Sequence, residues 1–175
     1  MAEFSKRHDS KLLIIMRHAE ADWGLDDFNR PLTKRGYEQA ATAGKWLMES
    51  ETVPEMIISS AALRTRQTTT WIEDALGEKA PTASLDERLY NAPSSSLISA
   101  INNAPASVNS LMLVAHLPGV QDAALQLMRA DSAVEASTQI SYGFPPASIA
   151  IFEVLGEWGE LVEGEAKLIN FRVFS

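Results

Sequence analysis

The chain has 175 residues, of which 46% are hydrophobic and 22% are charged, and its formal net charge is −8. This acidic balance argues against a nucleic-acid-binding protein and against a polybasic protein that binds membrane surfaces. A pocket built by a few arginines could still bind a small anion. Because the chain has no cysteine, disulfides, thiolate catalysis and zinc sites with cysteine ligands are excluded.

The N-terminal segment, "MAEFSKRHDSK", is polar and lacks the apolar core of a secretory signal. No apolar run in the sequence approaches the length of a transmembrane helix. We therefore expect a cytoplasmic protein that does not bind membranes. The length fits one domain of ordinary size. No linker, repeat or low-complexity segment divides the chain, so the sequence predicts a single domain over residues 1–175.

Short apolar runs alternate with longer amphipathic segments along most of the chain. The runs are continuously apolar, as in strands that are buried on both faces, and the segments between them have helical spacing. Thr33 is suited to cap the first helix and Gly77 to end the second. In chain order, the sequence predicts strands over 11–16, 56–59, 83–86 and 111–115, and helices over 34–49, 61–76, 94–102 and 118–130.

The C-terminal part of the chain has a different pattern. The stretches "ASIAIFEVL" and "AKLINFRVF" are typical of two strands, and a turn rich in glycine and glutamate separates them. Strands that alternate with helices imply a mainly parallel sheet with helices on both faces. The predicted fold is therefore a three-layer α/β/α sandwich whose mainly parallel sheet ends in an antiparallel C-terminal edge hairpin.

Basic side chains follow three of the predicted strands. In "LLIIMRHAEADWG", Arg17 and His18 come directly after the first strand, and His116 follows the strand over 111–115 in the same way. Arg64 comes shortly after the second strand. Ligands in open α/β sheets bind beyond the carboxyl ends of the strands. We therefore expect these four side chains at one site, whereas the third histidine, His8, lies in the polar tail.

Two arginines and two imidazoles at one point suit a phosphoryl group. One guanidinium group can bind phosphate through two parallel hydrogen bonds. A neutral imidazole can attack phosphorus. Nearby arginines would lower the pKa of that imidazole and keep it unprotonated. The helix that begins near Pro118 could add backbone N–H groups.

Other readings of these residues are open. Each histidine could be a hydrogen-bonded loop residue without a role in catalysis. Glu20 and Asp22 could join His18 and His116 as metal ligands, although a solvated loop is the preferred interpretation of the two acids. The sequence lacks a GxxxxGK[ST] phosphate loop, GxGxxG, HExxH and GxSxG, so nucleotide-binding, zinc-protease and serine-hydrolase motifs are excluded.

Four segments together resemble a known family. "RHAEA" at 17–21, "SSAALRTRQT" at 59–68 and "LVAHLPGV" at 113–120 resemble the motifs of the histidine phosphatase superfamily, also called phosphoglycerate mutase-like. "NRPLTKRGYEQA" at 29–40 resembles the short SixA-like branch, the protein phosphohistidine phosphatases. The resemblance covers nearly the whole chain, and it is specific because the four segments have the family's order and spacing.

The resemblance implies a role for each residue. His18 would be the nucleophile, and Arg17, Arg64 and His116 would bind the phosphoryl group. The family needs no metal and no cofactor. Ala19 stands where the family usually has glycine after the histidine, which leaves the backbone less freedom.

A second departure concerns the proton donor. The mutase-like and general phosphatase branches carry a glutamate that donates a proton to the leaving group, and Asn91 stands at its place. Glu87 lies nearby in the sequence but is more typical of a surface ion-pair partner. Without a dedicated acid, the resemblance favours phosphohistidine on proteins, or another phosphoramidate, as the substrate.

Two rival functions are open. The first is a phosphatase for sugar or nucleotide phosphates, in which Glu87 or an acid of the 19–27 loop donates the proton. The second is a non-catalytic module that binds phosphate or phosphoproteins on the same fold. The expected partner is accordingly a phosphorylated protein or a small phosphorylated substrate, with no nucleic acid.

Overall fold

The computed structural model describes residues 10–24 and 26–175, and it contains one six-stranded sheet with the strand order β3-β2-β4-β1-β5-β6. The predicted polar tail, including His8, lies outside the described residues. The strands are β1 (Ser10–Arg17), β2 (Met56–Ser60), β3 (Ser84–Asp86), β4 (Ser110–Ala115), β5 (Ile149–Leu155) and β6 (Ala166–Arg172). The α-helices are α1 (Lys34–Glu49), α2 (Leu63–Leu76), α3 (Ser94–Asn102), α4 (Gly119–Leu127) and α5 (Val134–Tyr142).

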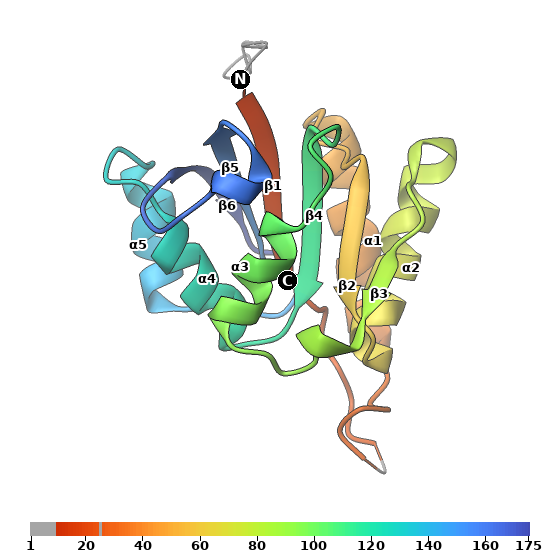
Figure 1. Cartoon of the computed structure of the whole chain (residues 1–175). Coiled ribbons are helices and arrows are strands. Elements are labelled where there is room, and N and C mark those ends of the chain that lie inside the picture. Colours follow the sequence, from red (N-terminus) through yellow and green to blue (C-terminus); the bar gives the residue numbers. More distant parts are fainter. Residues whose placement is uncertain (1–9, 25) are drawn as a thin grey trace.

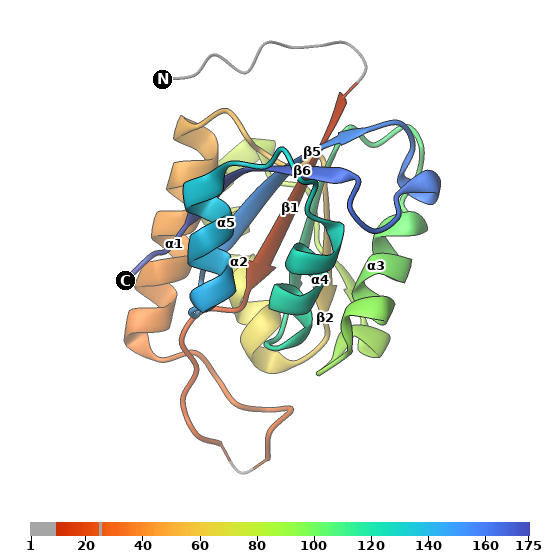
Figure 2. The ribbon, with the colours of Figure 1, turned by 90° about the vertical axis from the view of Figure 1, so that its left-hand side faces the viewer.

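The sheet is parallel through β3, β2, β4 and β1, and β5 and β6 continue it in antiparallel pairing. Figure 1 shows α1 and α2 on one side of the sheet and α3, α4 and α5 on the other, and Figure 2 shows α4 and α5 in front of the strands. This arrangement confirms the predicted three-layer sandwich with an antiparallel C-terminal edge.

Both faces of the central strands are covered by helices. In β1, Leu13 and Ile15 pack into the apolar cluster under α3, α4 and α5, whereas Ile14 and Met16 pack into the cluster under α1 and α2. Successive side chains of a strand point to opposite faces. A strand covered on both sides must therefore be apolar at every position, which explains the uninterrupted run before Arg17.

The helix ends follow local signals in the sequence. The Thr33 hydroxyl accepts a hydrogen bond from the Gly36 N–H at 3.0 Å and caps α1. Gly77, with φ of +62°, ends α2 in a conformation that favours glycine. Each predicted strand and each of the first three helices matches an observed element to within about two residues.

The structure corrects the prediction for residues 118–130. There α4 ends at Leu127, because Met128 pairs with Ala166 of β6 and the Arg129 N–H donates to the Ala166 carbonyl at 2.8 Å. A further helix, α5, follows and was not predicted. Its serine, threonine and β-branched residues are weak helix formers, and Ala133 provides no side-chain cap. Burial of Ala136 and Ile140 holds it against the sheet.

No helix in the described part of the chain is both long enough and apolar enough to cross a membrane.

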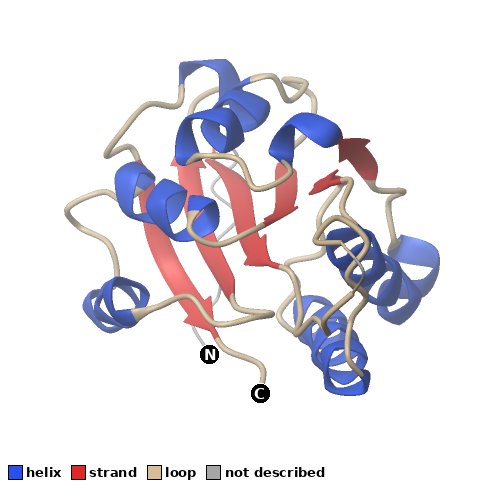
Figure 3. Ribbon diagram, turned by 90° about the horizontal axis from the view of Figure 1, so that it is seen from below, coloured by secondary structure: helices blue, strands red, loops and turns tan. Residues whose placement is uncertain are grey.

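Strands β1, β2 and β4 run parallel, so their carboxyl ends meet at one edge of the sheet. Figure 3 views the molecule from this end, where the loop between β1 and α1 also lies.

Candidate active site

A cavity of about 310 Å³ lies at the carboxyl ends of the central strands. Arg17 and His18 reach it from the end of β1, His116 from the end of β4, and Arg64 from the first turn of α2. The structure thus brings together the four residues that the sequence indicated. The cavity is lined by Arg17, His18, Glu20, Ala21, Asp27, Arg30, Arg64, Asn91, His116, Leu117 and Pro146.

The backbone around His18 holds its ring in one tautomer. The His18 N–H donates to the Ala115 carbonyl at 3.1 Å, and the His18 carbonyl accepts from the Ala147 N–H at 3.0 Å. Its Nδ1 lies 2.7 Å from the Ala19 carbonyl oxygen. Since a carbonyl oxygen can only accept, we assign the proton to Nδ1. Nε2 therefore carries the lone pair.

The environment of His18 favours the neutral ring. Burial lowers the pKa of His18 to about 3, and the charges of Arg64 and Arg17 and the neighbouring His116 act in the same direction. The hydrogen bond to Ala19 raises the pKa of His18, but its effect is smaller than the combined lowering. His18 is therefore uncharged at neutral pH, as a nucleophile must be.

His116 is held by a side chain of the neighbouring strand. Its Nε2 lies 2.7 Å from Ser60 Oγ, and its ring centroid lies 5.3 Å from that of His18. Burial, followed by the charge of Arg64, lowers the pKa of His116 to about 3. The neutral ring carries one proton, which lies on Nε2 when the Ser60 hydroxyl accepts and on Nδ1 when that hydroxyl donates. Nδ1 is buried and has no partner in residues 10–24 and 26–175.

The two arginines are tethered at their outer nitrogens. Arg17 Nη1 donates to the Phe144 carbonyl at 3.0 Å, and Arg64 Nη1 donates to the Asp27 carbonyl at 2.7 Å. Their Nε atoms are buried and have no partner among the described residues. Burial and the charge of Arg64 lower the pKa of Arg17. Two cations are thus held close together, and their repulsion favours the binding of an anion.

Four buried side-chain atoms have no hydrogen-bond partner in the described structure: Arg17 Nε, Arg64 Nε, His116 Nδ1 and Ser148 Oγ. A buried polar group without a partner is costly, and native structures contain few of them. Here three of them belong to residues that line one cavity beside the free Nε2 of His18. The oxygens of a tetrahedral anion in the cavity can accept from both arginines, and from His116 when its proton lies on Nδ1.

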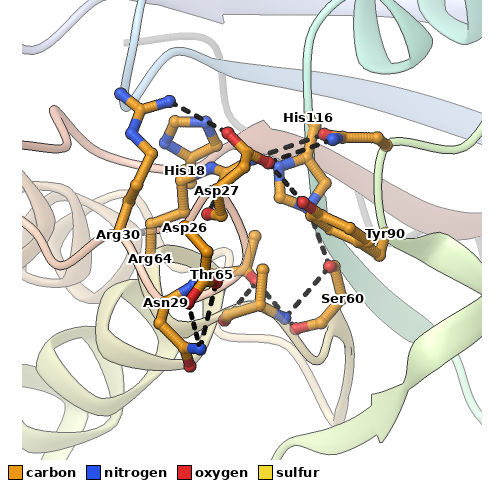
Figure 4. A network of polar contacts seen from close by, with 12 residues as sticks. His18, Asp26, Asp27, Asn29, Arg30, Ser60, Arg64, Thr65, Tyr90 and His116 are labelled. Carbon is orange, nitrogen blue, oxygen red and sulfur yellow. Dashed lines mark hydrogen bonds and ion pairs between the residues drawn. The ribbon is translucent and has the colours of Figure 1, made fainter. Parts of the chain in front are cut away.

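The loop between β1 and α1 adds acids to this cavity. Glu20 receives a hydrogen bond from the Thr33 hydroxyl at 3.0 Å and pairs with Arg35 at 3.7 Å. Asp27 accepts hydrogen bonds from Tyr90, Arg64 and Asn91, as Figure 4 shows for the first two. The sequence did not single out Asp27 or Tyr90. Asp27 and Tyr90 are 63 positions apart in the sequence, and no local sequence pattern indicates a contact between them.

Asn91 and Glu87 lie in different places. Asn91 lines the cavity and contacts both Arg64 and Asp27. Glu87 instead lines a separate depression between β3 and α3. The structure therefore leaves Glu20 and Asp27, and not Glu87, as the described carboxylates at the cavity.

The alternative metal site gains no support from the geometry. Within 10–24 and 26–175, no three His, Asp or Glu side chains are grouped so that they could hold a metal ion. Asp22 does not line the cavity, and its carboxylate accepts a hydrogen bond from the Trp23 N–H at 2.8 Å.

Ala19, at the position where the family has glycine, donates its N–H to Thr68 Oγ1 at 3.0 Å.

Comparison with known proteins gives a consistent assignment. Residues 13–135 match the family model described as the histidine phosphatase superfamily (branch 1). An uncharacterized protein of Mycobacterium tuberculosis, Rv1276c, is 36% identical over 163 residues, which are 90% of this chain and 99% of the relative.

Two solved structures share both fold and sequence with the chain. One, from Nakamurella multipartitia, is provisionally described as the phosphohistidine phosphatase SixA. It is 25% identical with a TM-score of 0.84, over 94% of this chain and 96% of the other. The second, from Agrobacterium tumefaciens, has the same provisional description. It is 26% identical with a TM-score of 0.76, over 93% of this chain and 97% of the other.

Proposed function

Because the chain belongs to the histidine phosphatase superfamily, we propose that it is a metal-independent phosphatase with a covalent phosphohistidine intermediate on His18. The observation that carries this proposal is that three buried nitrogens without a partner, Arg17 Nε, Arg64 Nε and His116 Nδ1, belong to residues of the cavity that His18 also lines. The oxygens of a phosphoryl group suit the guanidinium groups of the two arginines.

The reaction has two steps. His18 Nε2 attacks phosphorus, and the bond between phosphorus and the leaving group breaks with its electron pair going to the leaving atom. Arg17, Arg64 and His116 hold the phosphoryl oxygens and stabilise the charge that develops on them. Water then attacks phosphorus and passes a proton to a phosphate oxygen or to solvent. The bond between phosphorus and His18 Nε2 breaks with its electron pair returning to Nε2, so that inorganic phosphate leaves and the neutral imidazole is restored. The carbonyl of Ala19 keeps the Nδ1 proton of His18 in place throughout.

We further propose that the substrate is phosphohistidine on a protein, or a related phosphoramidate. An alkoxide leaving group needs a proton as it departs. Asn91 cannot supply one, and the hydrogen bond from Tyr90, together with Arg64 and Asn91, lowers the pKa of Asp27 below its usual range and keeps it ionised. An imidazole that already carries a proton on its second nitrogen can leave without such help. The descriptions of the two SixA-like structures support the same substrate.

Glu20 favours a second candidate, a phosphatase for small phosphate esters. Its carboxylate belongs to the cavity lining, so it could reach a leaving oxygen. Its contacts with Thr33 and Arg35 argue against that role, because they hold the carboxylate at the start of α1.

The substrate class is tested by measuring how the reaction rate depends on the pKa of the leaving group across a series of substrates. We expect phosphoramidates and aryl phosphates to react far faster than alkyl phosphates such as glycerol phosphate, since a missing general acid typically costs about 10²–10⁴-fold with poor leaving groups. Asn91→Glu should accelerate alkyl esters selectively. EDTA should leave every rate unchanged.

The matched control is Glu87→Gln, which should leave the leaving-group dependence unchanged because Glu87 lies outside the cavity. A flat dependence in the wild type would contradict the phosphoramidate assignment and would favour the small-ester phosphatase. Binding of phosphate without turnover of any substrate would favour the non-catalytic module.

A further inference from the structure

Asp27 is, beside Glu20, one of two described carboxylates at a cavity whose arginines suit an anion. It lies in the loop between β1 and α1, and Arg64 holds it there through both its backbone carbonyl and its side chain. Its side chain is still 47% exposed. A carboxylate repels a phosphoryl group, so binding of the phosphate does not explain why an acid lies here.

One oxygen of Asp27 has room for another hydrogen bond. Oδ2 accepts from the Tyr90 hydroxyl, from Arg64 Nη2 at 3.2 Å and from Asn91 Nδ2 at 3.2 Å. In the described part of the chain, the contact of Oδ1 is a longer one, from Arg30 Nη1 at 3.3 Å. Since each carboxylate oxygen can accept about two hydrogen bonds, Oδ1 can accept one more. Figure 4 shows Asp27 between Arg30 and Tyr90 in this network.

The positive charges of the cavity make the position beside Asp27 Oδ1 selective for the charge of a leaving group. Arg17, Arg30 and Arg64 all line it, so a cationic leaving group would be repelled unless a negative charge lay beside it. The phosphoryl group occupies the donors of Arg17, Arg64 and His116. The leaving group must then lie on the opposite side of phosphorus from His18, because attack and departure are in line.

We propose that Asp27 selects leaving groups by charge, in that its carboxylate binds the N–H of a protonated imidazole leaving group and disfavours leaving groups that carry a negative charge. This role rests on the proposed phosphatase function. The phosphoimidazole enters with a proton on its second nitrogen, and that proton stays there, hydrogen-bonded to Asp27. The phosphorus–nitrogen bond breaks, its electron pair remains on the departing nitrogen, and phosphorus becomes bonded to His18 Nε2. The imidazole thus leaves neutral, and Asp27 transfers no proton.

Asp27→Asn tests this role because it removes the charge and keeps the shape. Its kcat/KM should fall for phosphoimidazole and for p-nitrophenyl phosphate, since Arg64 loses an ionic partner in both reactions. The fall should be at least about tenfold larger for phosphoimidazole, as is typical for loss of a hydrogen bond to a charged group. The variant should also raise the ratio of the rate with phosphoglycerate, which carries a carboxylate, to the rate with glycerol phosphate, which does not.

Asp26→Asn is the matched control. Asp26 is the adjacent acid, does not line the cavity and caps Asn29 within the loop. It should leave the ratios between these substrates unchanged. An equal loss by Asp27→Asn on all four substrates would overturn the proposal, because a residue that only positions Arg64 would affect them alike. A wild-type protein that cleaves none of the four would instead overturn the phosphatase function itself.

Discussion

At the scale of single residues, the chemistry of His18 depends on contacts made by its neighbours. Ala19 fixes the proton on Nδ1, and burial with the nearby arginines keeps the ring uncharged. Arg17 is the last residue of the buried strand β1, so its guanidinium is drawn into the same low-dielectric region. His18, the proposed nucleophile, and Arg17 are thus adjacent in sequence because the strand ends at the site.

The protonation of His116 gives a prediction about stability and pH. Its pKa is lowered from 6.5 to about 3 in the folded protein, so the unfolded chain binds more protons between these values. Stability contributed by the neutral ring is therefore present above pH 6.5 and is lost as the pH falls toward 3. His116→Gln, which stays neutral, should lose less stability over this range than the wild type. Urea unfolding of both proteins across the range measures the difference.

The same variant separates catalysis from folding. At neutral pH, His116→Gln should unfold within about 1 kcal/mol of the wild type, since glutamine can still bond to Ser60. Its rate should fall at least about a hundredfold, as for loss of a transition-state donor. A variant that is both inactive and unfolded would show that His116 serves the fold.

At the scale of elements, the first helix holds the loop of the active site. A Cβ on Gly36 of α1 would lie 2.1 Å from the Glu20 carbonyl oxygen, and the Thr33 N–H donates to the same carbonyl at 3.0 Å. The backbone two residues after His18 therefore rests directly on the first turn of α1. Glycine is required at position 36 because no side chain fits between them.

Gly36→Ala should therefore destabilise the protein by about 1–3 kcal/mol, as overpacking does, although alanine is the better helix former. It should also lower the rate, because the 19–22 segment must move. Gly143→Ala is the control: a Cβ there meets nothing within 4 Å, and φ is 166°. Thermal unfolding and turnover of both variants measure the effect. A Gly36→Ala protein as stable and as active as Gly143→Ala would contradict the packing argument.

The contrast between predicted and unpredicted features follows from sequence distance. Strands β1 and β4 could be predicted because apolar runs mark them, and so could the residues that follow them. Helix α5 could not, because its residues are weak helix formers that tertiary burial stabilises. Asp27 could not be singled out from the other acids of its loop, since its partners Tyr90 and Asn91 lie 63 and 64 positions away.

At the scale of the whole molecule, the parallel arrangement of β2, β4 and β1 creates the site. Their carboxyl ends meet at one edge, so groups separated by up to 99 positions, Arg17 and His116, line one cavity. The residue directly before the antiparallel β5 supports the site from the other side, since the Arg17 N–H donates to the Ser148 carbonyl at 3.2 Å. The site is therefore a property of the topology, and apart from Arg17 of β1 and Arg64 of α2 its lining residues lie in the loops that connect the elements.

The central claim is that His18 becomes covalently phosphorylated, and rapid quenching with a substrate that carries a radioactive phosphoryl group tests it most directly. We predict a phosphoenzyme in the wild type that is labile in acid and stable in base, as a phosphoramidate must be, with the label on the peptide that contains His18. The reaction should proceed equally in EDTA. A His18→Ala protein that still turns over at the wild-type rate, or a label that survives acid, would contradict the account.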